Sequence, residues 1–126
     1  MEGRIKVKVY YEDTDSLGVV YYANYLKYYE RGRTEYINAL GRPIAEWNAD
    51  GYNFAVFKMS ATWYKPARLG DEIDVVTTVE KGSTFRMRMI QKLFIGDELL
   101  NEAVIQLVCL DKNLELREFP DALCDL

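Results

Sequence analysis

Histidine is absent from the sequence, and this absence excludes a whole group of mechanisms. A chain without histidine has no Ser-His-Asp or Cys-His triad, no imidazole general base and no histidine-ligated metal. Acid–base chemistry near neutral pH must then use carboxylates, tyrosines, lysines, backbone dipoles or water. Cysteine is also scarce, because the chain has only Cys109 and Cys124 and no CxxC pair. We therefore expect two free thiols in a reducing compartment, with no disulfide framework and no zinc site. No cofactor is expected either.

A long apolar run and an excess of positive charge are absent as well. No segment reaches the length of a membrane span, and the N-terminal MEGRIKVKVYY lacks the apolar segment of a secretory signal. The net charge is −4 and the pI about 4.9, so electrostatics gives no reason to expect a nucleic-acid partner. A local basic patch can still bind the phosphates of a small ligand. We expect a cytoplasmic protein that neither inserts in a membrane nor binds nucleic acid.

What is present is the composition of an ordinary globular chain. With 126 residues, 49% of them apolar and 29% charged, the sequence fits one compact domain that spans 1–126. Several segments alternate apolar and polar residues or collect β-branched ones, which predicts strands, and short turns join the later ones as antiparallel neighbours. The predicted strands are 4–11, 54–64, 72–81, 84–94, 99–110 and 114–119.

One long helix is predicted between the first and second strands. From Tyr21 to about Leu40 the apolar residues follow helical spacing, and Gly41 followed by Pro43 marks the end. A shorter helix is predicted at 43–51, where proline in the first turn costs no hydrogen bond. Together these elements predict an α+β fold, in which an antiparallel sheet of five to six strands wraps around one long helix.

The sheet face that the helix leaves open is not purely polar. A single helix covers one face, yet apolar residues also occupy positions that belong to the other face. Either small elements or another copy of the chain must cover this apolar surface, and we favour an oligomer. The residues concerned are Val76, Ile90, Phe94, Val104 and Val108.

Residues 11–33 carry a motif with many fixed positions, Y-x-D-T-D-x-x-G-V-V-Y-x-x-N-Y-x-x-Y-x-E-R-x-R. It resembles the signature of the 4-hydroxybenzoyl-CoA thioesterase family of hotdog-fold enzymes, and within it the short acyl-CoA thioesterases associated with the bacterial Tol-Pal envelope system. Weaker similarity continues through FKMSATWYKPARLGD (57–71) and NEAVIQLVCLD (101–111). The resemblance implies a hotdog fold dimerised by its sheet edges, and hydrolysis of acyl-CoA thioesters.

The resemblance also implies roles for particular residues. Asp15, the second aspartate of DTD, falls at the catalytic carboxylate position, and Tyr22 falls where a backbone N–H polarises the thioester carbonyl. Gly18 and Val19 shape the approach to the helix, and Tyr21 belongs to the substrate-binding set. The acyl group is expected at the subunit interface of a homo-oligomer, at least a dimer and here a tetramer, with acyl-CoA as substrate and its nucleotide on basic surface residues.

The chemistry suits a chain without histidine. N–H groups at a helix start stabilise negative charge on a carbonyl oxygen, and the CoA thiolate leaves easily, so a carboxylate suffices as nucleophile or base. The sequence leaves open whether Asp15 attacks the thioester directly or activates a water. The Tol-Pal-associated enzymes usually have histidine at the position of Tyr22, whereas hydroxybenzoyl-type enzymes have an aromatic residue. If the contribution is a main-chain N–H, the side chain can change without loss of catalysis, and if histidine takes part chemically in its own branch, this chain lacks that help. The departure leaves the substrate class open.

Some of these residues have a second interpretation. Lys58, Arg86 and Arg88 project from one face of the predicted sheet, where they either meet the CoA phosphates or form a solvated strand face. Asp15 caps the helix in the alternative to catalysis, but it lies several residues too early for a helix that starts at Tyr21–Tyr22. We therefore favour the catalytic interpretation of this carboxylate.

Other residues of the motif region are expected to be structural. Asp13 is expected to satisfy loop N–H groups. The charged residues of the long helix are expected to pair within it, as Glu30–Arg33 or as Arg31–Glu35. The tyrosines of 21–36 are expected in core and interface packing, with one or two of them lining the acyl pocket as the alternative. Trp63 and Tyr64 are expected in the core and not in contact with a ligand.

Two other functions compete with thioester hydrolysis. Dehydratases and hydratases share the hotdog fold, but their chemistry depends on a catalytic histidine, which this chain lacks. The other alternative is a non-catalytic acyl-carrier or envelope-complex binding module. A pure binding module requires neither Asp15 nor Gly18, and thioester hydrolysis is therefore the leading hypothesis.

Overall fold

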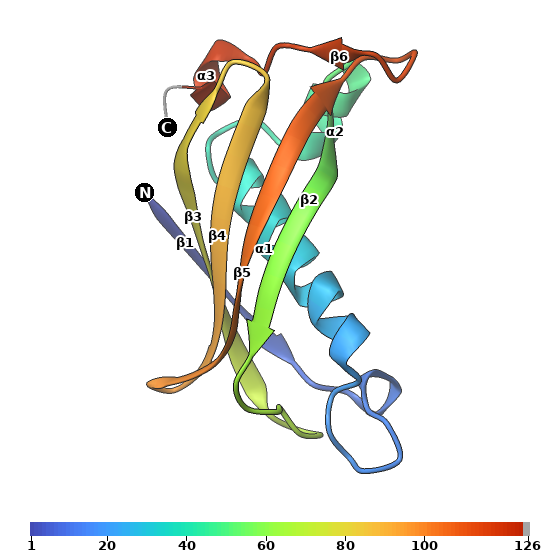
Figure 1. Ribbon diagram of the computed structural model, residues 1–126, viewed down its shortest axis with the longest axis vertical. Helices are drawn as coiled ribbons and strands as arrows, with labels where there is room; N and C mark the ends of the chain where they lie inside the picture. The colour runs from blue at the N-terminus through green and yellow to red at the C-terminus, as the bar shows by residue number, and fades with distance from the viewer. Residues whose placement is uncertain (125–126) are drawn as a thin grey trace.

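The computed structural model describes residues 1–124 and shows an antiparallel sheet curled around one long helix (Figure 1). The strand order is β1-β3-β4-β5-β2, with β6 paired to β5, which confirms the predicted α+β architecture. The strands are β1 (Glu2–Lys8), β2 (Asn53–Trp63), β3 (Glu72–Ser83), β4 (Arg86–Ile95), β5 (Glu98–Leu110) and β6 (Leu116–Arg117). The helices are α1 (Tyr25–Asn38), α2 (Ile44–Ala49) and α3 (Asp121–Cys124), with the 3-10 turns η1 (Tyr11–Asp13) and η2 (Tyr22–Asn24).

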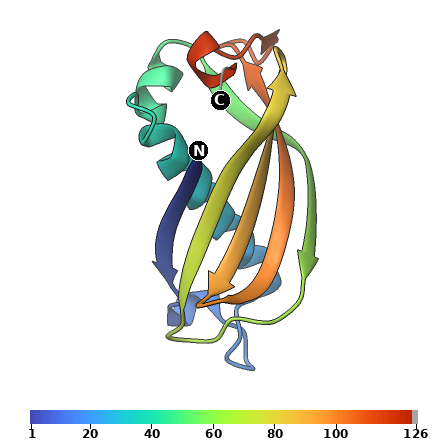
Figure 2. The ribbon, with the colours of Figure 1, turned by 90° about the vertical axis from the view of Figure 1, so that its left-hand side faces the viewer.

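The core lies between the sheet and α1, which runs inside the curl of the strands (Figure 2). Along β5, alternate residues from Asn101 to Cys109 are buried, and the residues between them are partly exposed on the outer face. The helix contributes four buried tyrosines, Tyr25, Tyr28, Tyr29 and Tyr36. Because tyrosine side chains are large, a single helix that carries four of them can fill the concave side of the sheet.

The helix comes close to the sheet at Gly32. A Cβ at this position would lie 2.6 Å from Val75 Cγ1, 2.9 Å from Gln91 Nε2 and 3.0 Å from Thr77 Oγ1. The Gln91 amide is itself fixed, because Nε2 donates to the Tyr29 carbonyl oxygen at 2.8 Å and to Thr77 Oγ1 at 2.9 Å. Only glycine therefore allows the helix to lie at this depth.

The long helix begins later than its spacing predicts. Residues 22–24 form the 3-10 turn η2, and α1 runs from Tyr25 to Asn38 instead of from Tyr21 to about Leu40. Tyr21 is extended, with φ −61° and ψ 127°, and its N–H donates to the Asp13 carbonyl oxygen at 3.0 Å. This hydrogen bond joins the helix start to the preceding loop. Hydrophobic periodicity along the sequence cannot reveal such a contact.

Other element boundaries differ by a few residues. Pro43 is extended, with φ −61° and ψ 148°, and is the N-cap of α2 where the prediction made it a helical residue. β2 has a bulge between Val56 and Lys58. The last predicted strand, 114–119, contracts to the two residues of β6, and the short α3 after it was not predicted.

The two ends of the sheet carry different elements. The loop between β1 and α1 lies at one end, together with the connection from β2 to β3 (Figure 1). Helices α2 and α3 and strand β6 gather at the opposite end. The motif of residues 11–33 is therefore divided between one end of the molecule and the helix that leads away from it.

Neither a spanning helix nor a disulfide occurs in residues 1–124. None of the helices there is long and apolar enough to cross a membrane. The Cys109 thiol is buried, which raises its pKa. Cys124 Sγ lies 3.6 Å from the Phe119 carbonyl oxygen, to which it donates a weak hydrogen bond.

The buried tyrosines of α1 should make the fold sensitive to alkali. Burial raises the pKa of Tyr25, Tyr28, Tyr29 and Tyr36 above the ordinary value of 10.0. Below that pH the hydroxyls are neutral in both states. Above it, the unfolded chain loses protons that the folded chain retains, so we expect stability to fall by up to about 1.4 kcal/mol per pH unit for each tyrosine. Urea unfolding between about pH 8 and pH 11 measures this, and a constant free energy of unfolding above pH 10 contradicts it.

Candidate active site

Asp15 lies in a tight turn of the loop that precedes the helix. Its carbonyl oxygen accepts a hydrogen bond from Gly18 N at 3.1 Å, and its Oδ1 accepts one from Leu17 N at 2.8 Å. Gly18 closes the turn with a φ of 77°, which glycine adopts without strain. The half-buried Asp15 side chain is therefore held in place by a backbone N–H of the same turn.

Backbone hydrogen bonds attach this turn to the connection between β2 and β3. Asp15 N donates to the Val19 carbonyl oxygen at 2.9 Å, and Val20 N donates to the Ala67 carbonyl oxygen at 2.8 Å. Ala67 N donates in turn to the Tyr25 hydroxyl at 3.0 Å. The turn, the β2–β3 connection and the first residue of α1 are therefore fixed to one another.

The helical segment starts directly after this loop, with two N–H groups that have no acceptor. Within residues 1–124, the backbone N–H groups of Tyr22 and Ala23 make no hydrogen bond, as is usual in the first turn of a helix. Asn24 N donates to the Tyr21 carbonyl oxygen at 2.8 Å, so the turn itself is formed. The dipole of α1 adds partial positive charge at this end. The helix start can therefore attract a negatively charged oxygen.

A hollow of about 260 Å³ lies beside Tyr22, and aromatic rings form most of its wall. Trp63, the last residue of β2, meets the Tyr22 ring edge-on at a centroid distance of 6.3 Å and the Tyr25 ring at the same distance. Tyr64 and Lys65 continue the wall along the chain. An acyl or aryl group fits the size and the apolar character of this hollow.

Trp63 and Tyr64 are not core residues, so the sequence prediction for them was wrong. Trp63 is 40% exposed and Tyr64 is 52% exposed. They lie at the end of β2, which is an edge strand, and the chain leaves the sheet directly after Trp63. Aromatic character alone predicts burial, but position at an edge decides it here.

The two aspartates of the DTD motif form different contacts. Asp13 is buried and its Oδ2 accepts a hydrogen bond from Tyr10 N at 2.9 Å, which confirms that it satisfies a loop N–H group. Asp15 does not cap the helix, because its carboxylate bonds Leu17 N and η2 has no side-chain cap. The capping alternative is therefore wrong.

Glu30 is one of two carboxylates of the long helix, and it pairs with Arg33, which is one of the two predicted helical pairs. The Arg33 side chain is buried, and its Nη1 donates to Gln91 Oε1 at 3.1 Å. Burial lowers the pKa of Arg33, and the Glu30 carboxylate counteracts this shift. Glu30 thus compensates a buried cation.

Lys58 and Arg88 share the outer face of the sheet, as predicted, at some distance from the Asp15 turn. Both lie opposite Gln106 of β5, one on each neighbouring strand. Arg88 Nε is 2.9 Å from Glu80 Oε2, so its charge already has a partner. In residues 1–124 neither cation forms a hydrogen bond or ion pair with the turn.

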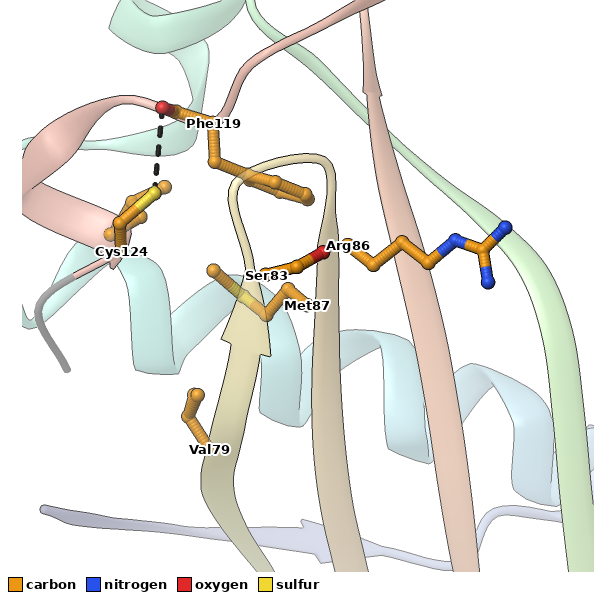
Figure 3. A pocket seen from close by; sticks show the side chains of 7 residues that line it. Val79, Ser83, Arg86, Met87, Phe119 and Cys124 are labelled. Atoms are coloured by element: carbon orange, nitrogen blue, oxygen red, sulfur yellow. Dashed lines mark hydrogen bonds between the residues drawn. The ribbon is translucent and has the colours of Figure 1, made fainter.

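Arg86 begins β4 near the opposite end of the sheet from the Asp15 turn (Figure 1). Its guanidinium points away from the small cavity under α3 (Figure 3) and lies over the Phe57 ring, 5.1 Å from the centroid. That cavity holds only about 10 Å³, roughly the space of one water. It is too small for an acyl group, and the hollow beside Tyr22 is the better candidate.

Three features meet at one end of the molecule: the Asp15 carboxylate, the free N–H groups of Tyr22 and Ala23, and the aromatic hollow. Such N–H groups stabilise an oxyanion, and a carboxylate can attack a carbonyl or activate a water. In residues 1–124, no group of three or more cysteine or acidic side chains is placed to hold a metal ion. The arrangement suits transfer of an acyl group to water.

Comparison with known proteins leads to the same chemistry. The model of the thioesterase-like superfamily matches residues 9–125. The acyl-CoA thioester hydrolase YbgC of Escherichia coli is 38% identical over 109 residues, 86% of this chain and 81% of that protein. A probable thioesterase of Bartonella henselae has a TM-score of 0.91 at 27% identity, covering 95% of this chain and 100% of its own. The DHNA-CoA thioesterase of Staphylococcus aureus has a TM-score of 0.88 at 25% identity, covering 93% and 80%.

A sheet wrapped around one helix, shared with these solved thioesterases, is the hotdog fold that the motif of residues 11–33 implied. The chain belongs to the thioesterase-like superfamily, whose model spans nearly its whole length. The family and the fold class expected from the sequence are thereby confirmed.

Proposed function

We propose that this protein hydrolyses acyl-CoA thioesters to the free acid and CoA. The observation that carries the proposal is the junction of the Asp15 turn with the helix start, where the Tyr22 and Ala23 N–H groups have no acceptor. The hollow beside Tyr22 supplies space for the acyl group next to this junction. The activity named for the Escherichia coli relative supports the same reaction.

In the proposed reaction, the thioester carbonyl oxygen accepts a hydrogen bond from Tyr22 N. Asp15 either attacks the carbonyl carbon, which forms an anhydride that water then hydrolyses, or removes a proton from a water that attacks. By either route the C–S bond breaks and CoA leaves as a thiolate, which takes up a proton. One oxyanion donor typically contributes on the order of 10²–10³ in rate, so the N–H groups account for a large share of the acceleration.

The tyrosine at position 22 fits a main-chain role. Its ring is 62% exposed and forms part of the hollow, where it meets Trp63 and lies 5.0 Å from the Tyr21 ring. A tyrosine in place of histidine is not expected to take over the proton transfer of an imidazole, because imidazole is the side chain suited to that role near neutral pH. The ring therefore selects the acyl group while the N–H beneath it polarises the carbonyl.

Release of free thiol from a panel of CoA thioesters tests the proposal. The panel should include short, medium and long acyl chains and flat aryl groups, because the hollow has aromatic walls. We expect cleavage of at least one class with saturation at micromolar to millimolar substrate, the usual range for enzymes. If no thioester on CoA or on an acyl carrier protein is cleaved, the proposal fails and a non-catalytic binding module becomes the better hypothesis for the function.

Two copies of the chain are proposed to pair along the free edge of β2. This edge strand is eleven residues long and bears the exposed apolar residues Val56, Phe57 and Trp63. A long apolar edge is a liability unless another strand covers it. The opposite edge strand, β1, is protected by alternating cations instead. Pairing at β2 would bring the Trp63 end of one chain close to the partner.

Phe57→Glu should therefore separate the two copies. A carboxylate buried at the β2 edge costs several kcal/mol on pairing, so we expect a monomer at micromolar concentration, with hydrolysis lost along with the dimer. Phe85→Glu is the matched control, since that phenylalanine is similarly exposed, 46% against 43%, but lies in the turn between β3 and β4. Sedimentation velocity and thiol release measure both variants. A parent chain that sediments as a monomer and is active rules out the shared interface.

The outer face of the sheet favours association of two such dimers. Ile90 and Val104 lie there in a hollow of about 370 Å³, with Lys92 and Glu102 at its border. No other element covers this hollow within residues 1–124. A tetramer would bury these apolar side chains, and the same sedimentation measurement distinguishes it from a dimer.

A further inference from the structure

We propose that Asn24 is a positioning residue for the hydrolysis, and that it acts by holding the carbonyl oxygen of Asp13. The inference rests on the proposed function, since it concerns the same Asp15 turn and helix start. It adds a residue to which neither the motif nor the preceding chemistry gives a role.

The contact joins the two parts of the site through one oxygen atom. The Asp13 carbonyl oxygen accepts a hydrogen bond from Asn24 Nδ2 at 2.9 Å and another from Tyr21 N at 3.0 Å. Asp13 stands two residues before Asp15, on the loop that carries the carboxylate. Asn24 is the last residue of η2 and directly follows Tyr22 and Ala23, which carry the free N–H groups. This oxygen therefore fixes the distance between the carboxylate and the N–H groups.

The anchor of this contact is itself immobile. Asp13 is only 5% exposed, its N–H donates to the Tyr10 carbonyl oxygen at 2.9 Å, and its Oδ2 accepts from Tyr10 N at 2.9 Å. Its carboxylate also faces the fully buried Tyr28 hydroxyl, whose pKa is raised by burial and further by this carboxylate. A rigid acceptor of this kind transmits the position of the loop to the helix start.

Without the Asn24 amide, the Asp13 carbonyl oxygen keeps only the bond from Tyr21 N, and the η2 turn, which follows Tyr21, can rotate. A small rotation redirects the N–H groups of Tyr22 and Ala23 and shifts the Tyr22 ring slightly, while the wall of the hollow from Trp63 to Pro66 belongs to another segment and stays in place. The loss should therefore appear in the chemical step and spare substrate binding. A misplacement of about 1 Å at a reacting group can cost on the order of 10²-fold in rate.

Asn24→Ala in the full-length protein tests this directly. We expect kcat to fall by roughly 10- to 100-fold, with KM within about twofold of the parent and an unchanged affinity for a non-hydrolysable thioether analogue of the substrate. Asn38→Ala is the matched control. Asn38 lies at the other end of α1, and its Oδ1 accepts from Ile44 N at 2.9 Å, so the control also removes one asparagine-to-backbone bond at a helix end. We expect its kcat to equal that of the parent.

A second variant, Asn24→Asp, keeps the shape of the side chain and removes its N–H donor. We expect the same loss of kcat without loss of folding, as monitored by thermal unfolding. Parent-level kcat in either Asn24 variant overturns the proposal, and so does an equal loss in Asn38→Ala, which would mark a general weakening of the helix. If the parent itself cleaves no thioester, it is the proposed function that fails, and thiol release from the parent separates the two outcomes.

Discussion

Asp15→Asn is expected to lower kcat for acyl-CoA hydrolysis by about 10²–10⁴-fold, the usual contribution of a positioned acid–base group. The substitution is nearly isosteric, and an amide oxygen can still accept the bond that Leu17 N donates at 2.8 Å. The turn should therefore persist while the negative charge is lost. An amide neither attacks a thioester nor takes a proton from water. Some activity above the uncatalysed rate should remain, because the Tyr22 and Ala23 N–H groups are untouched.

Asp111→Asn supplies a matched control for this experiment. Asp111 occupies a turn of the same kind after β5, where its Oδ1 accepts from Asn113 N at 2.8 Å and from Glu115 N at 3.0 Å. The two variants therefore remove one charge each from an equivalent turn. We expect Asp111→Asn to retain the kcat of the parent. Parent-level activity in Asp15→Asn, or an equal loss in both variants, would remove Asp15 from the mechanism.

The parts of the fold that were predicted correctly depend on local chemistry. The alternation of apolar and polar residues along β5 and the cluster of β-branched residues in β3 both indicate a strand with a buried face. Both patterns can be recognised from neighbouring residues alone. The Gly96–Asp97 pair gave the turn between β4 and β5 for the same reason, since Gly96 has a φ of 58°. The Glu30–Arg33 pair followed from helical spacing.

The parts that were missed depend on contacts between distant segments. The helix was expected from Tyr21, but the bond from Tyr21 N to the Asp13 carbonyl oxygen keeps that residue extended. Trp63 was expected in the core, because no local pattern shows that β2 is an edge strand. Both features shape the candidate site, so the sequence proposed a carboxylate and an N–H group but gave no sign of the hollow beside Tyr22.

Asn24 is a part of the candidate site whose position in the motif hints at its role. It is one of the fixed positions of the motif of residues 11–33, and asparagine is a preferred N-cap residue, yet Asn24, the N-cap of α1, makes no side-chain capping bond. Since the Asn24 amide does not cap the helix, its side chain is available for a hydrogen bond to another segment. The acceptor, the Asp13 carbonyl oxygen, becomes evident only when the loop is folded against the helix.

Gly32→Ala is expected to have the largest effect on stability, although alanine is normally the better helix former. The gain in helix propensity is about 1 kcal/mol. Against it, the new methyl group would lie 2.6 Å from Val75 Cγ1 and 2.9 Å from Gln91 Nε2, and overpacking of this kind costs about 1–3 kcal/mol. Displacement of the Gln91 amide also breaks its bond to the Tyr29 carbonyl oxygen, at a cost of roughly 1–3 kcal/mol for a buried polar group left unpaired. We expect a net loss of about 1–4 kcal/mol.

Gly3→Ala is the comparison that isolates the cause of this loss. A Cβ at Gly3 would also meet a neighbour at short distance, 2.8 Å from Cδ2 of the Tyr36 ring, but Gly3 lies on the edge strand β1 near the chain terminus, and this strand can shift away from the ring. At Gly32 the neighbours are two strands of the sheet and a hydrogen-bonded amide, which have no free space to move into. Urea unfolding should therefore show a lower midpoint for Gly32→Ala than for Gly3→Ala. An equal or higher midpoint for Gly32→Ala would mean that the helix can lift from the sheet at little cost, and the depth at which α1 lies would then not depend on this glycine.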